Sequence, residues 1–245
     1  MKKITAIIPC YNEEAGIADV VSGFSTQQLA KSGYELEVLV IDNNSTDKTA
    51  EVAAKAGAQV IFEPRKGKGN AVRSAFYSID NKTDYIIMID GDFTYSSSEI
   101  LRMIEPIDSG FCDVVVGSRL NGRIAKGSMT PLNRVGNIIF SQLVRFIYGS
   151  KVTDVLSGYF AWSRPSLERL RPHVESEGFA LEMEMVTKMA RLGESVYSVP
   201  ISYDTRAGVA NLRPFYDGIR ILRMLLRNIF WQVPEANAST VRNDM

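Results

Sequence analysis

The chain has 245 residues, of which 45% are hydrophobic, 9% aromatic and 23% charged, as in folded globular proteins and unlike disordered or fibrous ones. Its 28 basic and 28 acidic residues cancel, so no overall field attracts nucleic acid, and an anionic ligand must be bound by a local group of arginines or lysines. Two cysteines (Cys10 and Cys112) and one histidine (His173) exclude a disulfide framework and a His-rich metal site, and indicate a reducing compartment.

The N-terminus is not predicted to be a signal peptide. The apolar run after Lys3 ends at Pro9, below the roughly 7 to 15 residues that a secretory signal needs. No uncharged stretch approaches the roughly 18 apolar residues of a membrane-spanning helix. We therefore expect a protein that is neither exported nor inserted across a bilayer.

Short runs rich in Ile and Val alternate with amphipathic segments through the first half of the chain. This alternation is typical of βαβ units, so we predict an α/β fold with a mostly parallel, Rossmann-like sheet flanked by helices. The expected strands are 4–8, 36–41, 59–62, 85–89 and 113–117, and the expected helices are 13–31, 47–56, 69–79 and 97–107.

In the second half, the Gly-rich and basic residues 117–127 predict a mobile loop. A helix at 131–148, a turn-rich segment up to residue 164, a helix at 179–192 and a strand at 195–201 that rejoins the sheet are expected to follow. The final helix is expected at 215–231, and the polar tail from residue 234 is expected to be disordered.

The final helix has two faces. Arginines 220, 223 and 227 lie on one side, and an apolar stripe lies on another, formed by Phe215, Ile219, Leu222, Leu226 and Phe230. Two interpretations are open: the stripe packs on the sheet, or the helix lies on a membrane surface.

Polar and glycine residues gather where the expected strands end. Because ligands of parallel sheets bind at the carboxyl edge, we predict that these loops form one crevice. The loops are 9–13, 42–45, 65–69, 90–92 and 117–119.

Asp90-Gly91-Asp92 directly follows a buried apolar strand. Paired carboxylates suit Mg²⁺ or Mn²⁺, which leaves coordination positions for the phosphates of a ligand, so a diphosphate is implied. The alternative is a solvated turn.

Asp42 lies where nucleotide sites place a carboxylate against the nucleoside, although it could instead form an Asx turn before a helix.

Lys68 lies in a Gly-rich segment, 66–71, that matches neither a dinucleotide fingerprint nor a P-loop, but could contact a ligand. Arginine binds phosphate through a bidentate fork, and several arginines around one cleft would suit a substrate with more than one phosphate. The candidates are Arg119, Arg123, Arg134 and Arg206.

A haloacid dehalogenase-like phosphatase is one alternative function. Residues 87–94 fit its strand followed by Asp-x-Asp-x-Thr, with Asp90 as nucleophile and Asp92 as acid or base. No later acidic pair for Mg²⁺ is found in the sequence, which argues against this alternative.

Six motifs, in order and spacing, resemble those of the GT-A glycosyltransferases of family 2, and among them the dolichyl-phosphate or polyprenyl-phosphate hexose synthases, including dolichyl-phosphate mannose synthase. They are found at 8–13, 40–47, 66–69, 89–92, 116–119 and 154–160. The resemblance covers about residues 4–222. It implies transfer of a hexose, with inversion, from a nucleotide diphosphate sugar (a UDP-sugar or GDP-mannose) to a polyprenyl or dolichyl phosphate.

The resemblance also implies roles for individual residues. Asp90 and Asp92 would hold the metal and the donor diphosphate, while Arg119 and Arg134 would bind the acceptor phosphate, with Glu182 and Glu184 on the acceptor side. Asp92, Arg119 and Arg134 are thus the expected catalytic residues. The nucleotide-sugar would be held by Pro9, Tyr11, Glu13, Asp42, Asn44, Lys68, Asp90, Gly91, Asp92 and Arg206.

Residues 1–233 are expected to form one GT-A domain, with the nucleotide-sugar half at 1–120 and the acceptor half at 121–233, followed by the tail at 234–245. The helices of the acceptor half predict peripheral contact with the cytoplasmic face of a membrane, and a separate membrane subunit is left open.

Two residues depart from the family pattern: Asn211 stands where a Lys is usual, and Thr94 where mannose synthases often have Gln. The first departure leaves a non-catalytic nucleotide-sugar-binding protein as a further alternative.

Overall fold

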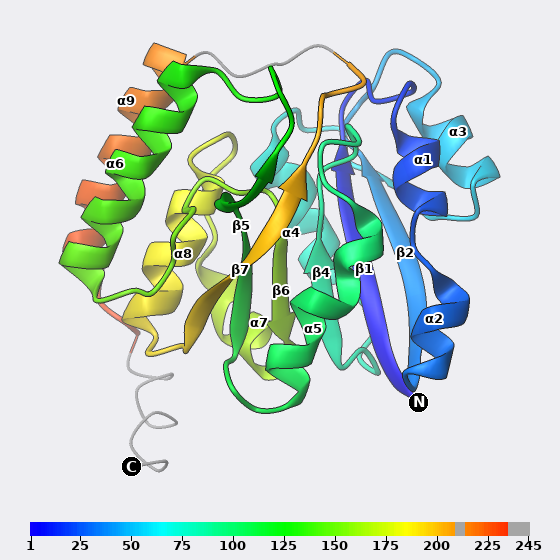
Figure 1. Cartoon of the computed structure of the whole chain (residues 1–245), viewed down its shortest axis with the longest axis horizontal. Helices are drawn as coiled ribbons and strands as arrows, with labels where there is room; N and C mark the ends of the chain where they lie inside the picture. Colours follow the sequence, from blue (N-terminus) through cyan, green and yellow to red (C-terminus); the bar gives the residue numbers. More distant parts are fainter. Residues whose placement is uncertain (209–213, 235–245) are drawn as a thin grey trace.

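A computed structural model describes residues 1–208 and 214–234 of the chain. Its centre is one seven-stranded sheet with the strand order β3-β2-β1-β4-β6-β5-β7 (Figure 1). The strands are β1 (Lys2–Cys10), β2 (Tyr34–Asp42), β3 (Gln59–Phe62), β4 (Tyr85–Met88), β5 (Val114–Ile124), β6 (Phe160–Ser163) and β7 (Val196–Tyr203).

The sheet is mostly parallel. Strands β3, β2, β1 and β4 run parallel to one another, and β5 runs parallel to β7, whereas β6 is antiparallel to both its neighbours. All four residues of β4 are buried, as expected for a central strand covered on both faces. The predicted α/β class is confirmed.

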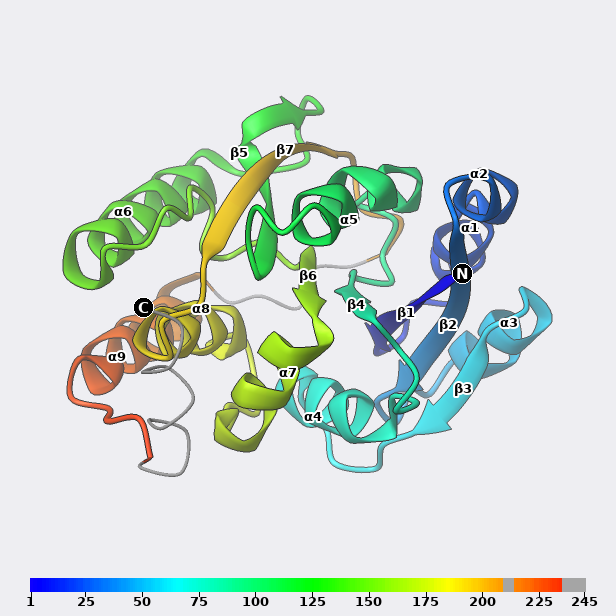
Figure 2. The same ribbon diagram turned by 90° about the horizontal axis from the view of Figure 1, so that it is seen from below.

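Helices cover both faces of the sheet (Figures 1 and 2). Alternate β1 side chains enter two separate hydrophobic cores, since Ile4 and Ile8 belong to one and Ile7 belongs to the other. The helices are α1 (Ile17–Ser22), α2 (Thr26–Lys31), α3 (Thr49–Lys55), α4 (Lys68–Ser78), α5 (Ile100–Asp108), α6 (Pro131–Tyr148), α7 (Arg164–Leu170), α8 (Leu181–Arg191) and α9 (Pro214–Ile229), with short 3-10 turns at Ser97–Glu99 and Arg171–His173.

The single helix predicted at 13–31 is wrong. The chain forms two short helices, α1 and α2, separated at Gly23. A Cβ at Gly23 would lie 2.5 Å from Ser97 Oγ, and Phe24 is buried in the core, so tertiary packing turns the chain here.

The mobile loop predicted at 117–127 is also wrong, because β5 continues to Ile124 alongside β7, with an irregularity between Ser118 and Arg123. Gly122 permits the close approach of the two strands, since a Cβ there would lie 1.9 Å from the Ile201 carbonyl oxygen. The turn-rich segment before residue 164 contains β6, and the following helix α7 was likewise not predicted. Strand β6 has only four residues and no Ile or Val, so composition did not indicate it.

Helices α6, α8 and α9 lie together at one end of the molecule (Figures 1 and 2). The apolar stripe of α9 faces outward rather than the sheet: Phe215 is 80% and Phe230 83% exposed, and Ile221 and Leu225 form the packed side. We call the outward-facing apolar residues of the two helices the α6/α9 surface; they are Leu132, Val135, Ile138, Ile139, Phe146, Phe215, Tyr216, Ile219, Leu222, Leu226 and Phe230. In the described parts of the chain, no helix is long and apolar enough to span a membrane.

Candidate active site

Asp90 and Asp92 lie just beyond the carboxyl end of β4, at the centre of the sheet edge. Gly91 brings the backbone close to the first strand, because a Cβ at this position would lie 2.5 Å from Cys10 Sγ. Asp92 is 1% exposed, and its Oδ1 accepts a hydrogen bond from the Thr94 backbone N–H at 3.0 Å. The solvated-turn alternative for this pair is therefore wrong.

Lys68, the first residue of α4, bridges two carboxylates. Its Nζ lies 2.7 Å from Asp90 Oδ1 and 2.7 Å from Glu182 Oε1, and 17% of its side chain is exposed. Burial alone would lower the pKa of Lys68, but the adjacent charges of Asp90 and Glu182 outweigh it and raise this pKa. The ammonium is therefore a fixed positive charge.

Arg206 forms a second bridge. Its Nη2 lies 2.6 Å from Asp92 Oδ2, and its Nη1 lies 3.6 Å from Glu13 Oε1. The Ala207 N–H donates to the Asp92 carbonyl oxygen at 3.1 Å, which fixes the segment after β7 against the aspartate pair. Two cations thus hold four carboxylates at this edge.

The carboxylates nevertheless repel one another, and burial disfavours their charged forms. Burial, followed by the charge of Asp92, raises the pKa of Glu13 to about 7. Burial and the charge of Asp90 raise the pKa of Asp92, although Arg206 opposes the shift. A divalent cation between Asp90 and Asp92 would relieve this repulsion, and two carboxylates meet the demand of Mg²⁺ or Mn²⁺ for hard oxygen ligands. The residues therefore fit such an ion, although no group of three or more potential ligands is found in the described residues.

The loops after β1 and β2 are joined by hydrogen bonds. The Asn12 N–H donates to Ser45 Oγ at 3.0 Å, and the Glu13 N–H donates to Thr49 Oγ1 at 2.8 Å. Asp42 is buried, and its Oδ1 accepts the Ser45 N–H, three residues further on, at 3.2 Å, which holds the side chain against the loop that follows β2.

Other predicted nucleoside residues lie around the same edge. Lys66 Nζ donates to Tyr11 Oη at 3.0 Å and lies 4.8 Å from the centre of the tyrosine ring. The Asn44 amide donates to the Pro64 carbonyl oxygen at 3.2 Å. Pro9 and Glu13 line a narrow cavity of about 110 Å³ together with Cys10, Asn43, Lys68, Ala71, Asp90, Gly91, Asp92, Phe179 and Arg206.

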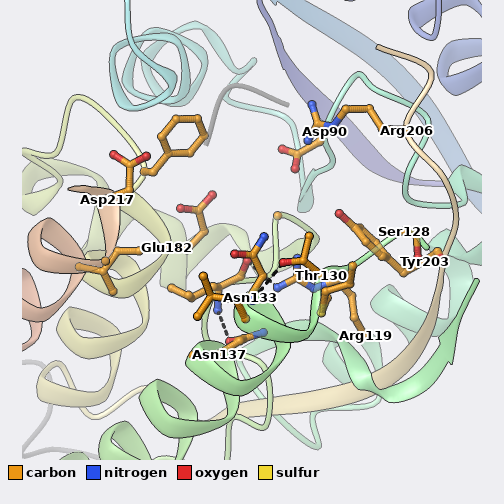
Figure 3. Close-up of a pocket in the computed structure, with 18 of the residues that line it drawn as sticks. Asp90, Arg119, Ser128, Thr130, Asn133, Asn137, Glu182, Tyr203, Arg206 and Asp217 are labelled. Atoms are coloured by element: carbon orange, nitrogen blue, oxygen red, sulfur yellow. Dashed lines mark hydrogen bonds between the residues drawn. The ribbon is translucent and has the colours of Figure 1, made fainter. Parts of the chain in front are cut away.

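A larger cavity of about 580 Å³ extends from Asp90 to helices α6 and α9 (Figure 3). Its polar wall includes Ser128, Thr130 and Asn133, at the start of α6, and its apolar wall includes Leu132, Phe140, Phe215 and Ile221. Both cavities share Lys68, Asp90, Phe179 and Arg206, which mark their junction.

The structure brings Arg119 to this cavity, but its guanidinium is committed to the protein. Nε and Nη2 donate to the two Asp154 carboxylate oxygens at 2.8 Å each, and Nη2 also donates to the Leu156 carbonyl oxygen at 2.8 Å. The guanidinium carbon lies 5.2 Å from the centre of the Tyr203 ring. Arg119 therefore supplies positive charge to the cavity. Because Nε and Nη2 are already hydrogen-bonded to the protein, it has no free pair of donors for a bidentate contact with a phosphate.

The structure does not bring Arg134 or Glu184 to the cavity. Arg134 is exposed and outside the lining. Glu184 is fully buried, accepts the Ser176 N–H at 2.7 Å and pairs with Lys188 at 2.7 Å, so its contacts organise the segment before α8. Asn211 lies outside the described residues.

Sequence reasoning missed several residues of the cavity. Tyr203 supports Arg119 from β7, and the Tyr95 hydroxyl accepts the Gly158 N–H at 2.8 Å. Gly158 is required beside the aspartate pair, since a Cβ would lie 2.3 Å from Asp90 Oδ2. Asp154 and Gly158 both lie in the motif at 154–160, so this motif could have indicated that they belong to the site.

A mostly parallel sheet with a carboxylate pair at its carboxyl edge and two adjoining cavities beside that pair is the arrangement expected of a GT-A glycosyltransferase. The structure is similar to that of glucosyl-3-phosphoglycerate synthase from Mycobacterium tuberculosis in complex with Mn²⁺, uridine diphosphate and phosphoglyceric acid, with a TM-score of 0.72 and 22% identity, covering 96% of this chain and 80% of that one. Residues 5–171 match the model of glycosyl transferase family 2, and the chain belongs to this family.

Two relatives from Haloferax volcanii match most of the chain. Glycosyltransferase AglJ is 39% identical over 226 residues, covering 91% of this chain and 71% of the relative. A dolichyl-phosphate hexose transferase is 32% identical over 226 residues, covering 91% and 92%. The chain is therefore an enzyme of the glycosyltransferase class, which decides against the phosphatase and non-catalytic alternatives.

Proposed function

We propose that the enzyme transfers a hexose, with inversion, from a nucleoside diphosphate sugar to a polyprenyl or dolichyl phosphate at a membrane surface. The observation that carries this proposal is the 580 Å³ cavity, which begins at the Asp90–Lys68 pair and ends between two helices with outward-facing apolar side chains. An acceptor with an anionic head and an apolar chain would match this cavity, with its head near Lys68 and its chain between the two helices. Residues 1–233 would act as one domain, with the donor bound by 1–120 and the acceptor by 121–233.

On the donor side, Asp90 and Asp92 would hold Mg²⁺ or Mn²⁺, which when bound supplies positive charge to the departing diphosphate. Arg206, 2.6 Å from Asp92, is placed to contact the same phosphates. Pro9, Tyr11, Asp42 and Asn44, on the joined loops after β1 and β2, would hold the nucleoside. The similar structure that contains uridine diphosphate supports a UDP-sugar as the first donor to test.

The acceptor needs no general base. A phosphate monoester is largely dianionic at neutral pH and can attack the anomeric carbon directly. What the site must provide is fixed positive charge in a cavity with little water, because two anionic groups approach each other. Arg119 and Lys68, which both line the larger cavity, would provide this charge. Arg134 is exposed on α6 and lies outside the lining of the cavity, so we assign it no contact with the acceptor phosphate.

The α6/α9 surface supports contact with a bilayer. Its apolar side chains lie beside the exposed arginines 220, 223 and 227, which form the neighbouring side of α9, a combination that binds the interface of anionic membranes. The two buried free cysteines suit a reducing compartment, so we place the enzyme on the cytoplasmic face. A membrane subunit, if the enzyme has one, would bind the same surface.

The test is an extraction assay on the full chain with Mn²⁺. UDP-glucose and GDP-mannose, each labelled in the sugar, are offered with polyprenyl phosphate in vesicles or with 3-phosphoglycerate as a water-soluble acceptor. Label that enters the organic phase only with the lipid phosphate supports the proposal. Transfer to phosphoglycerate, with none to the lipid, would overturn the acceptor class while leaving the glycosyltransferase assignment intact.

A further inference from the structure

Lys68 lies at the junction of the two cavities, and the packing of its neighbours fixes its position. Its neighbours Gly67 and Gly69 pack against the backbone of residues 176 and 177, where a Cβ at Gly69 would lie 1.7 Å from the Ser176 carbonyl oxygen. The Gly69 N–H donates to the Glu177 carbonyl oxygen at 3.0 Å. The start of α4 therefore has little freedom, and the ammonium is directed between Asp90 and Glu182.

The two partners of Lys68 belong to different sites. Asp90 is one of the two carboxylates suited to the metal, whereas Glu182, in the first turn of α8, lines only the larger cavity. Both Nζ–O distances are 2.7 Å, so the ammonium is shared equally. An ammonium has three N–H donors, so one contact with each of the two carboxylates leaves a third N–H for a ligand.

We propose that Lys68 is a shared counter-ion that neutralises Asp90 through Oδ1 when no divalent ion is held there, and that Glu182 is a positioning residue that would retain the lysine for the acceptor anion when one is. This inference rests on the proposed function. A divalent ion held by Asp90 would repel the ammonium, whose Nζ lies 2.7 Å from Asp90 Oδ1, and Glu182 is the second anchor that would keep the lysine in the cavity. Lys68 would then be available to a phosphate in the larger cavity.

This arrangement predicts opposite effects from two substitutions. Removing the ammonium with Lys68→Met leaves Asp90 without its competing cation, so Mn²⁺ alone should bind about tenfold more tightly. Removing the second anchor with Glu182→Gln leaves the ammonium wholly on Asp90, so Mn²⁺ alone should bind several-fold more weakly. A loss of local structure would instead weaken binding in both variants.

The experiment measures Mn²⁺ binding by electron paramagnetic resonance and calorimetry, with and without UDP, in the absence of any acceptor. Lys55→Met is the matched control, because it removes a lysine charge on α3 from an exposed pair with Glu51. Thermal denaturation of each variant reports whether it is folded. If Lys68→Met fails to fold, Glu182→Gln together with the charge-retaining Lys68→Arg carries the test, and Lys68→Arg should bind Mn²⁺ no more tightly than the wild type.

Opposite shifts for Lys68→Met and Glu182→Gln, with Lys55→Met unchanged, support the shared counter-ion. Shifts of the same sign, or none, overturn it even when Mn²⁺–UDP still binds. Failure of the metal site of the proposed function has a different signature: Asp92→Asn would then keep wild-type Mn²⁺–UDP binding, or no protein would bind the complex.

Discussion

Arg119 and Asp154 form a buried bidentate pair, with Nε and Nη2 of the arginine each 2.8 Å from a carboxylate oxygen. The Arg119 N–H donates to the same carboxylate at 2.8 Å, which ties the side chain to the backbone of β5. Burial would raise the pKa of Asp154, but the charge of Arg119 and its hydrogen bonds outweigh burial and lower that pKa. The pair is therefore ionised, and it fixes one wall of the larger cavity.

We predict that Asp154→Asn lowers the free energy of unfolding by about 3–5 kcal/mol, because it leaves a buried guanidinium uncompensated. Asp204→Asn is the control, since Asp204 pairs at 3.7 Å with Arg123, whose side chain is 78% exposed, and should change stability by less than about 0.5 kcal/mol. Urea denaturation measures both. Equal effects would show that the buried pair contributes no more than the exposed one.

Glu13 gives the site a pH-dependent cost. Its pKa is raised from 4.5 in the unfolded chain to about 7 in the fold, so the native state binds more protons between these values, and stability falls as pH rises through that window. Without divalent cations, Glu13→Gln should raise the free energy of unfolding by about 1–3 kcal/mol at pH 8, with the gain vanishing near pH 4.5.

The measurement is urea denaturation of both proteins across this pH range in EDTA. Glu14→Gln is the control, because Glu14 is exposed and should show no gain at pH 8. A gain for Glu13→Gln that is independent of pH would contradict the assigned cause.

Two glycines should respond in opposite directions to alanine. Gly69→Ala places a methyl group where the Ser176 carbonyl oxygen lies, so we expect a loss of about 1–3 kcal/mol or more from overpacking. Gly136→Ala, on α6, meets nothing within 4 Å and should gain about 0.5–1 kcal/mol from helix propensity. Thermal denaturation distinguishes them, and a tolerated Gly69→Ala would show that the 176–177 backbone yields.

The α6/α9 surface should determine vesicle binding. Phe146→Ser combined with Phe230→Ser removes two exposed phenyl groups, 91% and 83% exposed, and should weaken binding to anionic vesicles about tenfold without loss of stability. The control is Phe62→Ser combined with Phe111→Ser, which removes two exposed rings, 60% and 62% exposed, elsewhere on the molecule. Equal weakening by both pairs, measured by vesicle flotation, would remove the α6/α9 surface from the membrane argument.

Sequence periodicity predicted the first-half strands and the carboxylate pair because parallel βαβ units repeat a strong local pattern. It could not predict β6, since four residues without Ile or Val become a strand only through pairing with β4 and β5. It also could not show that Arg119 is committed to Asp154, 35 residues away, because only the fold brings them together. The apolar stripe of α9 was visible in the sequence, but which way it faced was not, since α8 and α6 decide that.

The antiparallel strand β6 also constrains how the protein is made. The open side of β4 is closed only by residues 160–163, so a nascent chain that has emerged through residue 120 carries an incomplete sheet with a bare edge. Synthesis must add some forty more residues before this edge is covered. We therefore expect residues 1–120, expressed alone, to aggregate through this unpaired edge.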